Sequence, residues 1–419
     1  TTVTVENDVT DWYAGGSVVV TQTSSPAQPG KGTSPPESCH SPAPCWYVWE
    51  NEVRVITALT PLLNGRTQIT LNQPLVYAHQ GMGKTRGEVG LLTRNILIRT
   101  EITGVSDAIL DNDLRERRFA HTMIMHQGSM GKVQYTEFKY MGHLGTLARY
   151  PIHLHQVGIA GKDMVVRGNS IWRSGNRGYQ LHDVQGSLWE DNVSFDTTQS
   201  PLYVERTPGG SAVGPPSDNS LVHNLAVQSS AGTSFAPAPG TPEQNDATIL
   251  WFDTLDQIVL GNVLVGGGSN VGRGAPQGSG TPEPDSNGGG LWVPTSTDGT
   301  GKIRAPVFFK NEMHSNAGPG FAFWQVGSDI LHDFGEMMSW RNGGSGIRWG
   351  YYRTPHRVFN AQLLDNFYSS IEGGHAGSAS RYMQDSEIID NKSGWGPEAI
   401  SIGTLARPTY PDNPMTYVR

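Results

Sequence analysis

The sequence has no long apolar runs, few charged residues and only two cysteines among its 419 residues. No stretch approaches the roughly 18 consecutive apolar residues that indicate a transmembrane helix, so we expect no membrane span. Charged residues make up 16% of the chain and the formal net charge is −8, which argues against a nucleic-acid-binding protein. An acidic polymer would bind only at a local basic patch.

The two cysteines, Cys39 and Cys45, lie in a segment rich in proline and serine. We predict that they form a small disulfide-closed loop, which implies an oxidising extracellular compartment. Two free thiols or half a metal site are the alternatives, although the spacing fits no common zinc motif. Sequons at Asn192 and Asn391 and a first residue other than Met are typical of a processed, secreted glycoprotein.

Glycine and proline, by contrast, are abundant, with 52 and 27 residues, and this composition favours a turn-dense all-β protein. Short phrases that begin with a polar residue and continue with aliphatic residues recur about every 23 to 26 residues where no insertion intervenes. This period predicts a right-handed parallel β-helix with three short strands per turn. Asparagine suits a stacked turn because it tolerates left-handed backbone and its amide bonds along a ladder. The phrases are Asn169–Ile171, Asn192–Phe195, Asn224–Val227, Asn262–Val265, Asn311–Met313, Asn360–Leu364 and Ser386–Ile389.

The repeat divides the chain into two predicted domains. Residues 1–100 contain strands without the period, among them Asn95–Ile98, and are interpreted as an N-terminal β module that caps or leads into the helix. Residues 101–419 form the predicted β-helix. Its spacing stretches at 206–220, 229–247 and 266–302, where loops either wall a binding face or are surface padding.

The segment Arg149–His155 is the most informative local pattern. A strand alternates its faces, so His153 and His155 would point one way while Ile152 and Leu154 point the other. A pair of ordinary surface or stacked histidines is the alternative interpretation. If Leu154 and its counterparts Leu181 and Val204 point inward, His155, His182 and Glu205 from successive turns point outward together.

Two chemistries fit such a cluster of imidazoles. The histidines can serve as general acid–base groups with lowered pKa values. They can also bind a divalent metal, zinc or calcium, with His121, His153 and His155 as the predicted ligands. Strand alternation does not decide which way His121 points, because both faces of its predicted strand are apolar.

Several motifs occur in an order that resembles one family. They are Glu88–Ile96, Met141–Gly145, Arg149–His155, Asn169–Ile171, Asn176–Arg177 and Glu190–Val193. The family contains the cell-migration-inducing hyaluronan-binding protein, its transmembrane hyaluronidase relative and fibrocystin-like proteins. The resemblance covers roughly residues 10–205 and implies a partial eight-glycine domain followed by a pectin-lyase-like β-helix. It also implies an extracellular or cell-surface protein that binds or depolymerises hyaluronan or another uronic-acid polysaccharide.

The resemblance implies a hydrolase or lyase site, with departures from the family pattern at Ile159, Trp172, Ser200 and Arg206. One of His155 and His182 would move the proton, and Glu205 would orient or ligate. Arg149 and Arg177 would bind carboxylates. The full catalytic set is His155, His182, Glu205 and Arg177, and the substrate-binding set is Arg149, Arg173, Asn176 and Trp172. The rival hypothesis is a non-catalytic structural or adhesive protein, a homo-oligomer, filament or surface-layer subunit.

Overall fold

A computed structural model describes most of the chain, and its elements are almost all β-strands. The described residues are 1–25, 49–107, 119–127, 131–144, 146–207, 209–229, 248–268, 289–293, 307–323, 330–349, 356–366, 370–373, 381–384, 386–389, 400–402 and 417–418. Among these residues, the 3-10 helices Leu63–Gly65 and Ile159–Asp163 interrupt the strands. No helix in the described ranges has the length and apolar character to cross a membrane.

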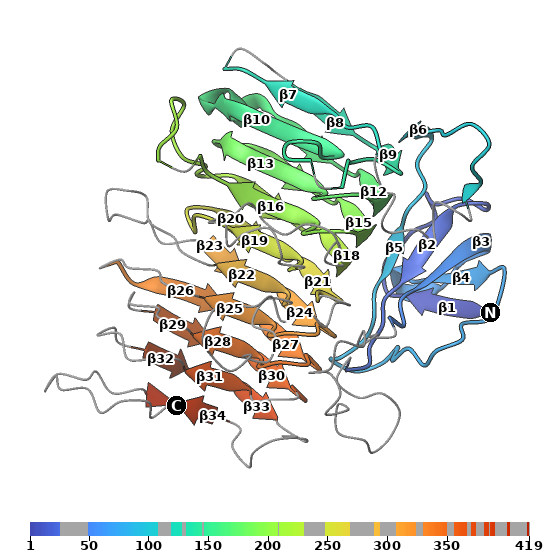
Figure 1. Ribbon diagram of the computed structural model, residues 1–419. Helices are drawn as coiled ribbons and strands as arrows, with labels where there is room; N and C mark the ends of the chain where they lie inside the picture. The colour runs from blue at the N-terminus through green and yellow to red at the C-terminus, as the bar shows by residue number, and fades with distance from the viewer. Residues whose placement is uncertain are drawn as a thin grey trace, which may run out of the picture.

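Three ten-stranded parallel sheets build the predicted parallel β-helix, which is thereby confirmed (Figure 1). Sheet 1 contains β7 (Met123–Met125), β10 (Ile152–Gly158), β13 (Tyr179–Val184), β16 (Leu202–Glu205), β19 (Leu250–Phe252), β22 (Leu291–Val293), β25 (Phe321–Phe323), β28 (Ile347–Trp349), β31 (Ile371–Gly373) and β34 (Ile400–Ile402). Sheet 2 contains β8 (Lys132–Gln134), β11 (Val165–Arg167), β14 (Leu188–Glu190), β17 (Ser220–Val222), β20 (Ile258–Leu260), β23 (Val307–Phe309), β26 (His332–Gly335), β29 (His356–Phe359), β32 (Arg381–Gln384) and β35 (Tyr417–Val418). Sheet 3 contains β6 (Ile96–Arg99), β9 (Thr136–Lys139), β12 (Ser170–Ser174), β15 (Val193–Thr197), β18 (Leu225–Ser229), β21 (Val263–Val265), β24 (Glu312–His314), β27 (Met338–Trp340), β30 (Gln362–Leu364) and β33 (Glu387–Ile389).

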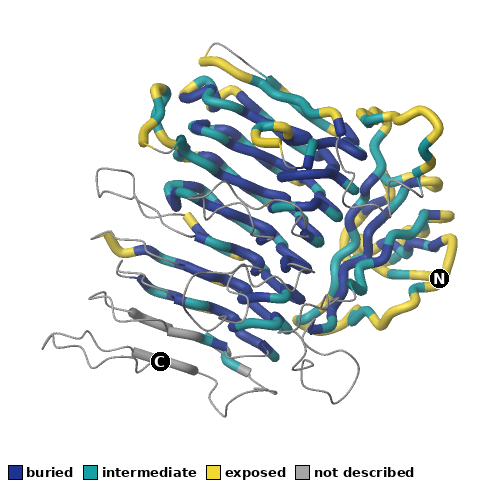
Figure 2. Tube along the Cα trace, in the orientation of Figure 1, coloured by how far each residue is buried: buried dark blue, intermediate teal, exposed yellow. Residues whose placement is uncertain are grey.

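The core runs along the axis of the helix, because the inward residue of each strand stacks on its equivalents in the neighbouring turns. In sheet 1 these residues include Leu154, Leu181 and Val204, each at most 1% exposed. Figure 2 shows buried strands through the stack and exposed segments mainly at the first turns and the N-terminal module. Alternation therefore fixes which side chains of sheet 1 face outward.

An asparagine ladder joins the turns that precede sheet 3, as the repeat predicted. Asn192 Oδ1 accepts from the backbone N–H and the amide of Asn169, and the same pattern links the next members. The ladder consists of Asn169, Asn192, Asn224, Asn262 and Asn311. The left-handed conformation, however, belongs to the residue before each asparagine, such as Asp191 (φ 55°) and His223 (φ 53°). The predicted left-handed asparagine is wrong at these turns, since its amide needs the ordinary backbone of the ladder position.

The N-terminal module is a five-stranded antiparallel sheet, ordered β1 (Thr2–Val5), β4 (Thr67–Leu71), β3 (Glu52–Pro61), β2 (Ser17–Val20) and β5 (Val89–Leu91). It lies along the flank of the β-helix, beside β12 to β24, and does not cover an end of the stack (Figure 1). Of the two predicted roles, a cap or a lead into the helix, the module has the second, because β5 is followed directly by β6 of sheet 3. β6, which was predicted to belong to the module, pairs with β9 in sheet 3, so the helix starts at Ile96, five residues before the predicted boundary.

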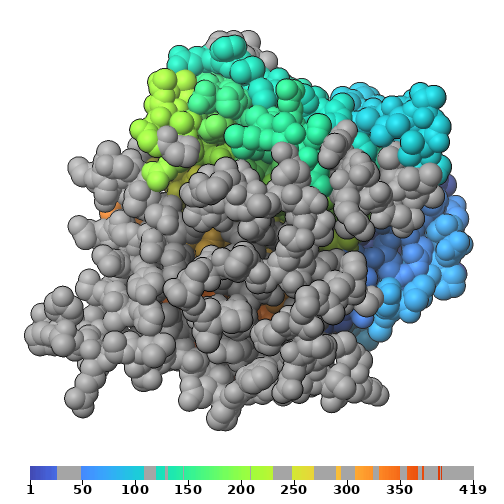
Figure 3. Space-filling view, in the orientation of Figure 1, coloured from blue at the N-terminus to red at the C-terminus, as the bar shows by residue number. Residues whose placement is uncertain are grey.

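Apolar and polar contacts hold the module against sheet 3. Val19 and Leu92 of the module form one buried cluster with outward residues from four successive turns of the sheet, namely Trp172, Phe195, Val227 and Val265. Further along the stack, the Gln22 amide donates to the Ser315 carbonyl at 2.9 Å. The module therefore contacts turns that are far apart in the sequence. In Figure 3 it borders the described surface of the first turns.

Candidate functional site

The outer face of sheet 1 carries the predicted histidine row. Strand pairing aligns His155 with His182 and His182 with Glu205, which confirms that residues distant in the chain stack in register. His153 lies on the same face, in the neighbouring row, where it aligns with Gln180. The alternation read from the sequence therefore placed these side chains correctly.

Three histidines, His153, His155 and His182, form a compact cluster that we call the histidine trio. The ring centroids of His153 and His155 are 4.9 Å apart, and those of His155 and His182 are 4.7 Å apart. One ring nitrogen from each lies within 4.8 Å of the other two. His153 is only 1% exposed, whereas the other two rings are partly exposed. The cluster thus has a buried base and an accessible rim.

Hydrogen bonds fix the tautomers of two members of the trio. His153 Nδ1 lies 3.2 Å from the carbonyl oxygen of Ala148, which can only accept, so Nδ1 carries the proton. His182 Nε2 lies 3.0 Å from Thr207 Oγ1, and the Thr207 hydroxyl donates to the Asp183 carboxylate. Thr207 therefore accepts from His182, whose Nε2 is protonated. The lone pairs of these rings are left on His153 Nε2 and His182 Nδ1.

Two ring nitrogens of the trio are buried without a hydrogen-bond partner in the described part of the chain. They are His153 Nε2 and His155 Nδ1. Burial lowers the pKa of His153 to about 3, with a further contribution from His155. Burial, followed by the charge of His182, also lowers the pKa of His155. Both rings are neutral at physiological pH and can present lone pairs.

Low pH is expected to destabilise the turns around His153. The unfolded imidazole titrates near 6.5 and the folded one near 3, so between these values only the unfolded state gains the proton. In metal-free protein, acidification from about pH 6.5 to about pH 5 should cost about 2 kcal/mol at this residue, and above pH 6.5 it should cost nothing. Urea unfolding at both pH values measures this loss, and His153→Gln should show a smaller one. Equal losses in the two proteins would contradict the assignment.

Arg177 and Glu205 form a buried ion pair beside the trio. Arg177 Nη1 lies 2.9 Å from Glu205 Oε2, and Gln180 donates to the same oxygen at 2.8 Å. The guanidinium stacks 3.5 Å from the centroid of the Tyr203 ring, and the arginine is only 3% exposed. Burial opposes its charge, but Tyr150, Tyr203 and Glu205 outweigh burial and raise its pKa. The prediction that Arg177 binds a substrate carboxylate is therefore wrong, because this group is committed to Glu205.

The structure moves His121 out of the predicted metal set. Its Nε2 lies 2.6 Å from Arg149 Nη1, and since a guanidinium only donates, this nitrogen accepts. His182 takes its place beside His153 and His155. Arg149 itself is exposed, in keeping with its predicted contact with an acidic ligand.

Three of the predicted substrate-binding residues lie away from the trio. Trp172 is 5% exposed, belongs to the module interface and donates to Glu137 at 2.8 Å, so it offers no face to a sugar. Arg173 lies on sheet 3, and its Cζ is 5.2 Å from the centroid of the Trp172 ring. Asn176 is 4% exposed and its amide donates to the carbonyls of His143 and Thr146. Asn176 therefore holds the loop that contains His143 and Thr146.

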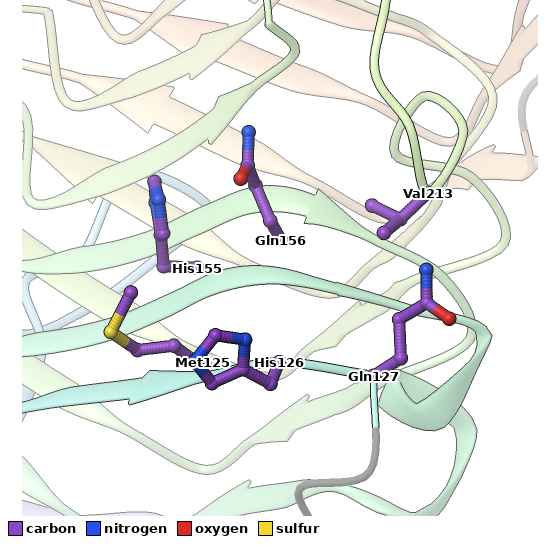
Figure 4. Close-up of a pocket in the computed structure, with 6 residues that line it drawn as sticks. All are labelled: Met125, His126, Gln127, His155, Gln156 and Val213. Atoms are coloured by element: carbon purple, nitrogen blue, oxygen red, sulfur yellow. The ribbon is translucent and has the colours of Figure 1, made fainter.

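A shallow cavity of about 340 Å³ opens beside the accessible rim of the trio. Figure 4 shows His155 and Gln156 from β10 above Met125 and His126, with Val213 on the opposite side. Gln127 completes the lining. Val213 comes from the first predicted insertion, 206–220, so this loop lines the cavity, in line with the first of its two predicted roles. The other two insertions lie mostly outside the described residues.

Sequence reasoning missed Thr207 and Asp183, which orient His182. Strand alternation predicts that Asp183, adjacent to His182, faces the core. Its left-handed backbone (φ 50°) turns the strand locally, and the buried carboxylate reaches Thr207 in the next turn. The sequence offered one indication of this role, namely that the acidic Asp183 directly follows His182 in the predicted strand.

The covalent predictions have different outcomes. Cys39, Cys45 and Asn391 lie outside the described residues. Asn192 is 1% exposed and its amide donates to the Val166 carbonyl within the ladder. A glycan at Asn192 is therefore incompatible with the fold.

Together these features define an all-β, parallel β-helix protein with a histidine cluster on one outer face. The CEMIP beta-helix family model matches residues 119–321, and this match supports the predicted resemblance to the CEMIP and fibrocystin-like family. Fibrocystin-L of Mus musculus is 27% identical over 303 residues, which cover 64% of this chain and 6% of that protein. Cell surface hyaluronidase CEMIP2 of Homo sapiens is 31% identical over 158 residues, 35% of this chain and 11% of that protein. A G8 domain-containing protein of Dictyostelium discoideum is 29% identical over 193 residues, 46% of this chain and 14% of that protein. The matches thus span a small part of each relative.

Proposed function

We propose that this chain binds and depolymerises an acidic, uronic-acid-containing polysaccharide of the hyaluronan type on the outer face of sheet 1, outside the cell or at its surface. The observation that carries the proposal is the convergence of His153, His155 and His182 beside an open cavity. The similarity to CEMIP2, whose name describes a cell surface hyaluronidase, supports the choice of substrate class.

Charge and geometry assign distinct tasks to two residues near the trio. Arg149 is exposed on a chain with net charge −8 and offers a local cation for a uronate carboxylate. Glu205 follows His182 in the row, and Arg177 and Gln180 fix its Oε2. Its Oε1 can then accept a proton or orient a water against the glycan. The positioning by Arg177 keeps this carboxylate in place without contact between the arginine and the substrate.

Incubation with a panel of acidic glycans, hyaluronan included, tests the proposal. We expect new reducing ends, with absorbance from unsaturated uronates if cleavage is by elimination. His182→Ala and Glu205→Gln should each reduce the initial rate at least about tenfold, because both remove a group at the reacting centre. Lys132→Ala, exposed on sheet 2, is the matched control and should retain the wild-type rate. Absence of product and of binding across the panel would contradict the proposal.

Binding without cleavage is the second candidate function. It is favoured by Trp172, which stands at a departure from the family pattern and is buried under the N-terminal module. In this case the β-helix is a rigid adhesive or filament subunit. Glycan retention without product, together with self-association in sedimentation measurements, would support it.

A further inference from the structure

We propose that the histidine trio is a zinc-type metal site with His153, His155 and His182 as its three protein ligands. The site concerns the same face as the proposed function, but metal binding requires no glycan turnover. No other described cluster combines three imidazoles; the second group of close titratable residues, Glu88, Glu312 and His314, pairs two carboxylates with one histidine. Neutral imidazole is the common protein ligand of zinc, and three histidines with an open fourth position form a known catalytic zinc set.

The hydrogen bonds around the trio prepare two of its rings for a metal. A ligating histidine usually donates its other N–H to a carbonyl or a carboxylate, which fixes the tautomer. His153 donates Nδ1–H to the Ala148 carbonyl, and His182 donates Nε2–H to Thr207, whose hydroxyl donates to Asp183. Both hydrogen bonds are of the kind that orients a metal-ligating histidine through its second ring nitrogen. The lone pairs of these two rings are consequently left on His153 Nε2 and His182 Nδ1.

The unpaired nitrogens supply an independent observation. His153 is 1% exposed, yet its Nε2 has no hydrogen-bond partner among the described residues, and His155 Nδ1 is in the same condition. A buried polar atom without a partner costs about 1–3 kcal/mol, so native structures rarely retain one. A metal ion would satisfy both nitrogens. The ring nitrogens now lie within 4.8 Å of one another, and a metal bound at about 2.0–2.1 Å would draw them closer together.

The position of the cluster leaves room for a fourth ligand. His153 closes the base, whereas His155 borders the open cavity with Gln156 and Val213. A water molecule or a glycan oxygen can enter from that side. Zinc would lower the pKa of such a water to about 7 and so provide a nucleophile at neutral pH. His155 and His182 would then act as ligands and would not themselves carry the proton.

Metal analysis of the purified protein tests the site. After dialysis against Zn²⁺ and then metal-free buffer, we expect one zinc per chain, and bound Co²⁺ should give the visible absorption of a nitrogen-rich tetrahedral site. His153→Ala and His182→Ala should abolish both signals. His121→Ala and His126→Ala, which alter nearby imidazoles outside the trio, should leave them intact. Unchanged stoichiometry and spectrum after loss of trio members would overturn the proposal.

A second variant separates metal loss from misfolding. Thr207→Val removes the acceptor of His182 Nε2–H but no ligand, and it should weaken zinc binding about 10–100-fold with unchanged far-ultraviolet circular dichroism. An unaltered affinity in this variant would contradict the assigned tautomer and the site with it. Glycan cleavage by protein that fails to bind zinc or Co²⁺ would overturn the metal proposal alone. Stoichiometric zinc without glycan binding or cleavage would overturn the proposed function alone.

Discussion

Replacing Arg177 with leucine is expected to destabilise the protein by about 3 kcal/mol and to reduce glycan cleavage further than the loss of folded protein explains. The substitution leaves the Glu205 carboxylate, whose side chain is 14% exposed, without its 2.9 Å partner. It also removes the stack on Tyr203 and the hydrogen bond to Tyr150. An uncompensated buried charge is costlier than the intact pair is stabilising. Urea unfolding at neutral pH measures the change.

A double variant shows whether the ion pair is the cause. Arg177→Leu combined with Glu205→Leu should recover part of the lost stability, because no lone charge then remains in the apolar surroundings. Arg149→Leu, at an exposed arginine nearby, is the control and should change the free energy of unfolding by less than about 0.5 kcal/mol. A single Arg177→Leu variant as stable as the wild type would show that the buried pair contributes nothing.

Replacing Asn224, an interior member of the asparagine ladder, with alanine is expected to cost about 4 kcal/mol. Its Oδ1 accepts from the backbone and the amide of Asn192, and its own amide donates to Trp189 O and Asn262 Oδ1. All these groups are buried, so alanine leaves several of them without partners at about 1–3 kcal/mol each, partly recovered by relaxation or by water. Thermal and urea unfolding measure the loss.

The matched control for the ladder is an exposed amide. Gln127→Ala removes the same functional group from the surface and should be neutral within about 0.5 kcal/mol. If Asn224→Ala proved equally neutral, the ladder would be a consequence of stacking and no source of stability.

The fold was largely predictable because its determinants are periodic. Spacing of the asparagine phrases predicted the turns, and strand alternation predicted that His155 and His182 face outward in one row. The flank position of the N-terminal module was not predictable. It depends on an apolar cluster that joins Val19 of the module to Trp172 of the β-helix, residues that are far apart in sequence and that no periodicity links.

The candidate site was predictable only for residues whose outward direction follows from strand alternation. His121 has apolar neighbours at alternating positions and lies before β7, outside any strand, so strand alternation could not exclude it from the metal set. Arg177 sits in a turn between β12 and β13, where no alternation indicates burial. Asp183 escaped because a left-handed residue inside a strand changes which side chains meet. Long-range pairing and local backbone exceptions set these limits.

The flanking module has a mechanical consequence for the stack. Solenoids ordinarily melt from their ends, since each coil touches only its neighbours. Here the N-terminal module bridges coils from Trp172 to Arg341, whose guanidinium donates to the Thr23 carbonyl at 2.8 Å. The module therefore couples these coils into one cooperative unit, which should unfold in a single step.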